Sequence, residues 1–152
     1  MANAQAMCTS FKTDVLNGLH ALGASVIRAA TTKDAFKAAL YLATASLGAA
    51  TTAYSATGEV TGTNYTAGGV AVTTATAPTS TGTTAFITPS ASIVYTNVTL
   101  ATAFDAVLIY NDTAAGKNAV SVHTFGSQTV TAGTFTLTMP ANDATNALIR
   151  IA

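Results

Sequence analysis

The stretch TFTLTMP, at residues 134–140, alternates strictly between apolar and threonine side chains. Successive side chains of an extended chain point to opposite faces, so Phe135, Leu137 and Met139 share one face and the threonines share the other. This alternation is typical of an antiparallel strand that covers a core on one side and meets water on the other. The stretch therefore predicts a mainly β protein.

Short apolar segments recur before and after this stretch, separated by Gly, Asn, Pro and Thr. They predict strands at residues 70–74, 84–87, 92–98, 105–111, 119–125, 134–139 and 147–151. Residues 106–111 (AVLIYN) are apolar on both faces, which predicts a central strand, and residues 112–118 predict the hairpin loop that follows it. The whole pattern predicts an antiparallel β-sandwich, jelly-roll or Ig-like.

Two further segments have a less regular composition. The low-complexity stretch at residues 74–84 (TATAPTSTGTT) predicts an exposed loop, extended as an arm. Residues 34–47 (DAFKAALYLATASL) fit two structures, since Phe36 and Leu40 are spaced as in a helix while Phe36 to Leu42 also alternates as in a strand. The alanine content favours the helix, and the spacing alone leaves both structures open.

The N-terminal segment has the spacing of an amphipathic helix. Its apolar residues are separated by steps of four and three, and they are Met7, Phe11, Val15, Leu19 and Leu22. Gly23 follows as a helix stop. We therefore predict an N-terminal helix at residues 1–23 and a β-sandwich domain at residues 24–152. The apolar stripe of the helix would dock either on its own domain or on a neighbouring subunit.

Composition excludes several classes of partner. Only 8% of the residues are charged, and six basic residues balance six acidic ones. The basic residues are scattered, so nucleic acid is not an expected partner. No apolar run approaches the roughly 20 residues that span a bilayer, and the N-terminus does not have the pattern of a signal peptide, which predicts a chain made in a cytoplasm and not bound to a membrane. A nearly uncharged, threonine-rich chain is typical of a subunit held in an assembly, so we expect a homo-oligomer.

Candidate catalytic and metal-binding residues are few. The only histidines are His20 and His123, the only cysteine is Cys8 and the only glutamate is Glu59. None of them has the spacing of a metal site, a hydrolase triad or a glycosidase carboxylate pair. The glycines of GTNYTAGG do not form a phosphate-binding loop. The sequence therefore predicts a protein that is not an enzyme and that holds neither a cofactor nor a metal, with Cys8 an inert thiol and His123 a structural residue.

One long stretch has a familiar pattern. Residues 34–72 (DAFKAALYLATASLGAATTAYSATGEVTGTNYTAGGVAV) contain an F-K-x-A-L-Y segment that leads into T-A-Y, G-E-V and G-T-x-Y-x-A-G-G. This stretch resembles one common in small structural proteins of tailed bacteriophages, and the similarity continues through residues 88–111 and 119–140 to the ending LIRIA. The resemblance implies a mainly β virion component without catalytic residues, and it implies that residues 36–42 form a strand.

These observations lead to a functional hypothesis with two alternatives. The chain is expected to be a capsid decoration or cement protein in the virion, bound to copies of itself and to the major capsid protein. One alternative is a head-to-tail adaptor or a tail- or fibre-associated protein. The other is a carbohydrate-binding β-sandwich, which the absence of tryptophan disfavours. Candidate intersubunit contacts are Met7, Phe11, Val15, Leu19, Tyr54 and Tyr65, and the loop at residues 57–69 that contains Tyr65.

Overall fold

A computed structural model describes residues 3–8, 10, 11, 15, 19, 20, 22, 33–74 and 76–151. These residues form eight strands: β1 (Ala6–Met7), β2 (Phe36–Leu42), β3 (Val70–Val72), β4 (Thr79–Thr81), β5 (Thr84–Ile87), β6 (Ile93–Asn111), β7 (Ala119–Leu137) and β8 (Ile149–Ile151). One antiparallel sheet has the order β1-β7-β6-β2-β3 and a smaller one the order β4-β5-β8. The protein is therefore mainly β, as predicted.

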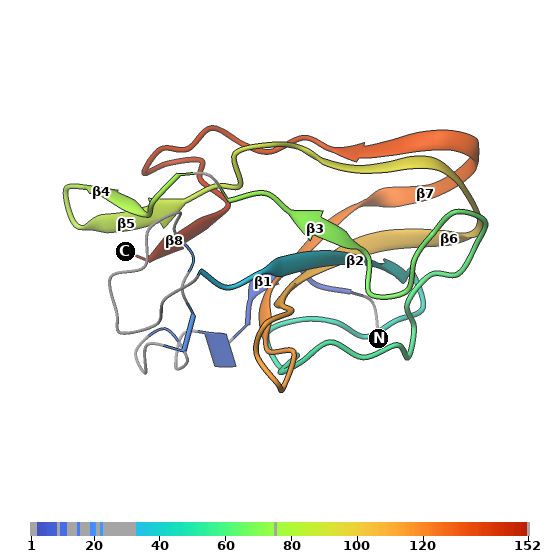
Figure 1. The fold of residues 1–152 in the computed structure, drawn as a ribbon, viewed down its shortest axis with the longest axis horizontal. Coiled ribbons are helices and arrows are strands. Elements are labelled where there is room, and N and C mark those ends of the chain that lie inside the picture. Colours follow the sequence, from blue (N-terminus) through green and yellow to red (C-terminus); the bar gives the residue numbers. More distant parts are fainter. Residues whose placement is uncertain are drawn as a thin grey trace.

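The β6–β7 hairpin organises the larger sheet. Figure 1 shows that both of its long strands bend back at the right of the view, so that each contributes to an upper and a lower layer. The pairing register shifts several times between Tyr95 and Ala106, and the positive φ angles of Asn97 (52°) and Ala132 (44°) lie in this region. Such bulges add residues to one strand and let it bend sharply.

Aromatic side chains fill the space inside the bent hairpin. Phe135 lies with its ring centroid 5.0 Å from that of Phe104 and 5.3 Å from that of Phe125. From the other end of β6 the fully enclosed Tyr95 donates its hydroxyl to the backbone oxygen of Ala38 in β2, at 2.7 Å. These contacts connect segments far apart in sequence into one hydrophobic core.

The alternation that predicted the fold is reproduced in the exposure of the side chains. Thr134, Thr136 and Thr138 are exposed, whereas Phe135 and Leu137 are half-buried against the core. At the other end of the hairpin β6 is buried on both faces from Ala106 to Asn111, as expected for a central strand. The loop at residues 112–118 joins the two strands, which confirms the predicted hairpin.

Residues 36–42 are a strand, which resolves the choice that the sequence left open. β2 pairs with β6 along its whole length, and its first half pairs with β3 on the other side. Pairing on both edges and burial of the side chains stabilise a strand here despite the alanines. Packing outweighs intrinsic helix propensity in such a segment.

Several predicted boundaries are wrong. The segments at 92–98 and 105–111 are one strand, and so are those at 119–125 and 134–139, because the bends pass through bulges and not through loops. The stretch at 74–84, predicted as a loop, contains β4, and the strands predicted at 70–74 and 147–151 are the shorter β3 and β8.

The predicted N-terminal helix is not supported. Met7, at its start, lies in β1 and pairs with Ser121 of β7, because the edge of β7 offers it backbone partners there. Most of the remaining predicted helix lies outside the described residues, as does its proposed end at residue 23. In the part of the chain that is described, no helix is long and apolar enough to cross a membrane.

Candidate functional site

A buried carboxylate, that of Glu59, gathers polar groups around it. This residue follows β2 and lies against the edge of that strand, where Val60 donates its N–H to Leu40 at 3.0 Å and Leu42 donates its N–H to Gly58 at 2.9 Å. Only 7% of Glu59 is exposed. A carboxylate in such a place needs several hydrogen-bond donors to offset the loss of its water.

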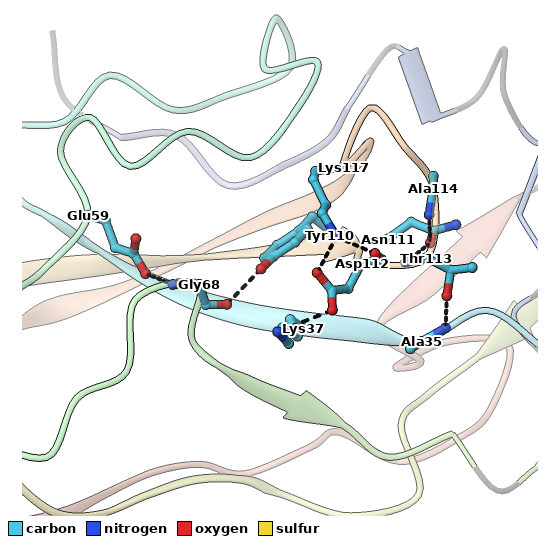
Figure 2. A network of polar contacts seen from close by, with 10 residues as sticks. All are labelled: Ala35, Lys37, Glu59, Gly68, Tyr110, Asn111, Asp112, Thr113, Ala114 and Lys117. Atoms are coloured by element: carbon cyan, nitrogen blue, oxygen red, sulfur yellow. Dashed lines mark hydrogen bonds and ion pairs between the residues drawn. The ribbon is translucent and has the colours of Figure 1, made fainter.

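Three donors converge on this carboxylate. The hydroxyl of Tyr54 lies 2.6 Å from Oε2, the hydroxyl of Tyr65 lies 2.8 Å from Oε1, and the N–H of Gly68 lies 2.7 Å from Oε1. We call Tyr54, Glu59, Tyr65 and Gly68 the Glu59 cluster. Figure 2 shows Glu59 reaching Gly68 at the start of the chain that leads into β3.

The other tyrosines extend the cluster into the sheet. Tyr110 of β6 donates its hydroxyl to the backbone oxygen of Gly68 at 2.9 Å, and Tyr65 accepts the N–H of Leu40 at 3.0 Å. Tyr54 stacks on Tyr110 with ring centroids 4.8 Å apart. All five tyrosines of the chain, the others being Tyr41 and Tyr95, thus use their hydroxyls in bonds within the chain. The group fastens residues 53–69 to β2 and β6.

The tyrosine hydroxyls of this region stay protonated in the physiological range. Burial raises the pKa of Tyr41 and that of Tyr110 to about 12. The pKa values of Tyr54 and Tyr65 rise further, first through burial and then because each hydroxyl donates to Glu59. A phenol with a raised pKa is a hydrogen-bond donor and a poor nucleophile or base. The Glu59 cluster is therefore equipped to hold a shape.

A second polar group lies where β2 and β6 meet. The carboxylate of Asp112 binds Lys117 at 2.8 Å and Lys37 of β2 at 3.1 Å (Figure 2). The bond from Lys117, first, and the one from Lys37 hold the pKa of Asp112 below its usual value. Beside it, Asn111 accepts the N–H groups of Thr113 and Ala114 at 3.0 Å each. These contacts fix the β6–β7 turn against β2.

The one thiol of the chain also lies in the interior. Cys8 is fully buried in the core, and burial raises its pKa to about 11, which keeps the thiol protonated and inert. Among the residues that the structure describes, no three His, Cys, Asp or Glu side chains gather as metal ligands do.

His123 lies on β7 with its Nε2 2.9 Å from the hydroxyl of Ser121. Burial lowers its pKa to about 4. The imidazole is thus neutral in the folded chain at neutral pH, where one ring nitrogen is left as acceptor and the other as donor. This neutral, half-buried state is compatible with the structural role predicted for His123.

The low pKa of His123 predicts a pH dependence of stability. Between pH 6.5 and pH 4 the unfolded chain binds a proton that the folded chain does not bind, so the free energy of unfolding should fall as the pH falls through that window. A pKa change from 6.5 to about 4 corresponds to roughly 3 kcal/mol in all, of which about 2 kcal/mol is lost between pH 7 and pH 4.5. Urea denaturation of the wild type and of His123→Gln at pH 7 and pH 4.5 checks this, and the variant should lose much less stability on acidification. Equal losses in both proteins would contradict the assignment.

The predicted intersubunit contacts lie in different places. Tyr54 and Tyr65 come together around Glu59, which the sequence did not reveal because the partners are separated in the chain. Phe11 is fully buried, Met7 and Val15 are half-buried against the core, and Leu19 is 39% exposed. The proposed contact role of these six residues stays a prediction.

Comparisons with family models, with curated proteins and with solved structures find no match to this chain.

Proposed function

We propose that this chain is a non-enzymatic structural subunit of a tailed-phage virion, and that it decorates the head by binding the major capsid protein and copies of itself. The observation that carries the proposal is that residues of the phage-like sequence pattern bind one another in the folded chain. Glu59 of G-E-V and Tyr65 and Gly68 of G-T-x-Y-x-A-G-G bind one another and fasten a loop to β2. In this fold the G-E-V and G-T-x-Y-x-A-G-G residues fix the shape of a loop. A family of assembly subunits would be expected to share residues with that task.

The proposed architecture is an antiparallel sandwich. The bent β6–β7 hairpin supplies strands to two layers, and Tyr95 and Phe135 point from one layer toward β2 and Phe104 of the other. A sandwich closed in this way is stiff, because its two layers share continuous strands. Stiffness suits a subunit whose exposed surface has to match a partner repeated around a shell.

The exposed surface supports binding by contact and not by charge. The outer side chains of the second half of β7 are Ser127, Gln128, Thr129, Thr131, Thr134 and Thr136, all uncharged and exposed. Charged groups at an interface have to be stripped of water when a partner binds, whereas threonine presents a methyl group and a small hydroxyl. Weak contacts of this kind add up when many copies bind one shell.

The test is to locate and count the chain in purified virions that contain it. We expect many copies per particle, labelled on the head surface by antibodies in electron microscopy. Particles stripped of the chain should release their DNA at a lower temperature than intact particles and regain heat resistance when purified protein is added back. A copy number that matches a single ring at the neck would replace decoration by the adaptor function, and absence from particles would refute both.

A further inference from the structure

The β4–β5 hairpin extends from one end of the molecule. In Figure 1 it lies at the left end of the longest axis, opposite the bend of β6 and β7. Every residue from 76 to 83 is exposed, and none of them is charged. A Cβ added at Gly82, in the turn of this hairpin, would meet nothing within 4 Å. The hairpin is thus an arm with free space around its tip.

The outer edge of this arm carries no charge. Among the described residues β4 pairs only with β5, through Thr79, Ser80 and Thr81, and it forms one edge of the smaller sheet. Natural proteins guard such an edge with a very short strand, lysine, proline, a bulge or an inward charge, because its free N–H and C=O groups can pair with another chain. β4 is short and follows Pro78, but Thr79, Ser80 and Thr81 all keep their backbone N–H groups. β4 has no charged residue, and its register with β5 is regular. This edge is therefore suited to pair with another strand.

A groove that could receive a strand lies beside the opposite edge of the same sheet. Its volume is about 390 Å³. Asn146, Leu148 and Arg150, in and just before β8, line one part of it, and Gln5 and Met7, in and just before β1, line another. Asn146 Nδ2 donates to Asp143 and Arg150 Nη1 donates to Ala144. The Gln5 amide, the Asn146 amide oxygen and the remaining N–H groups of Arg150 can bond threonine and serine hydroxyls and backbone groups. Ile151, at the end of β8, is 45% exposed and would be covered by an added strand.

We infer that β4 of one copy of this chain adds to β8 of a second copy, in the groove between β8 and β1. Within one chain β5 separates β4 from β8, so the same contact cannot form inside a single molecule. The two surfaces differ, which makes the contact heterologous and gives a ring or a filament of copies. This inference rests on the self-association in the proposed function and names the surface through which it occurs.

The first test is the oligomeric state of the purified chain by light scattering after gel filtration. Ser80→Lys puts an ammonium group on β4 that would face Arg150 of the neighbouring copy, and Gln5→Trp fills the groove from an exposed position. We expect each variant to have the mass of a single chain, while the wild type has the mass of an oligomer. Ser46→Lys makes the same substitution at an exposed site after β2 and should leave the oligomer intact. Circular dichroism verifies that all variants are folded.

Mixing Ser80→Lys with Gln5→Trp distinguishes the proposed heterologous contact from a symmetric one. Gln5→Trp keeps an intact β4 and Ser80→Lys keeps an intact groove, so the mixture should form pairs and nothing larger. A monomeric wild type, an unchanged oligomer in Ser80→Lys, or a mixture that stays monomeric would overturn the inference. An oligomer that dissociates as expected in a protein absent from virions would instead leave the inference standing and refute the proposed virion function.

Discussion

Gly69→Ala is expected to destabilise the protein more than any other single methyl addition on the loop before β3. Gly69 has a φ of +76°, and a Cβ built there lies 1.7 Å from the backbone oxygen of Ala38 and 2.7 Å from Cα of Ala39. No side-chain rotation relieves a collision with backbone, so the loop and β2 have to separate. That movement disturbs the bond from Tyr95 to Ala38 and the adjacent pairing of Ala38 with Val70. We expect a loss of more than about 4 kcal/mol, which would leave much of the variant unfolded.

Gly82→Ala is the matched control for this experiment. Gly82 also has a positive φ, of +59°, but its Cβ would meet nothing within 4 Å. Alanine there should cost only the backbone strain of the left-handed region, about 1–2 kcal/mol. The measurement is urea denaturation followed by tyrosine fluorescence, which the absence of tryptophan makes clean. Equal midpoints for the two variants would show that β2 and the loop do not approach each other as closely as described.

The parts of the fold that the sequence predicted are those governed by local pattern. The alternation at residues 134–139 follows directly from the two faces of a strand, and residues 112–118 carry the turn-forming residues of a hairpin loop. Residues 36–42 needed the resemblance as well, because the spacing fits a helix and a strand alike and the alanine content favours the helix. What settles that segment is pairing with β6, a strand nearly 70 residues away in the chain.

The parts that the sequence did not predict depend on contacts between distant residues. The joining of residues 92–98 and 105–111 into β6 requires bulges around Asn97 and a bend that encloses Phe104, and neither leaves a local pattern. The strand at Met7 depends on the free edge of β7. In the sequence Glu59 is the only glutamate and has no catalytic or metal-site spacing, and its tyrosine partners are recognisable only when the loop is folded back on β2. Its position as the only glutamate, surrounded in sequence by Tyr54 and Tyr65, was the one available indication.

Glu59→Ala is the second substitution with a large expected effect. It removes the acceptor of three donors, the hydroxyls of Tyr54 and Tyr65 and the N–H of Gly68, and leaves them in a site where little water enters. An unsatisfied buried donor costs about 1–3 kcal/mol, so the free energy of unfolding should fall by roughly 3–5 kcal/mol. Urea denaturation measures this loss, and a parallel loss of protection from hydrogen exchange is expected at the N–H groups of Gly68 and Leu40.

Two further variants separate the hydrogen bonds of Glu59 from its charge. Tyr54→Phe removes one donor to the carboxylate and leaves one of its oxygens without that bond, so it should cost about 1.5–3 kcal/mol. Glu59→Gln keeps the shape and one carbonyl acceptor, and its cost should lie between those of Tyr54→Phe and Glu59→Ala. Burying a charge is itself unfavourable, and a buried ionic group can sometimes be replaced without loss of stability. If Glu59→Gln and Glu59→Ala were both as stable as the wild type, the carboxylate would not be what fastens this loop, and the structural reason given for the shared G-E-V pattern would be lost with it.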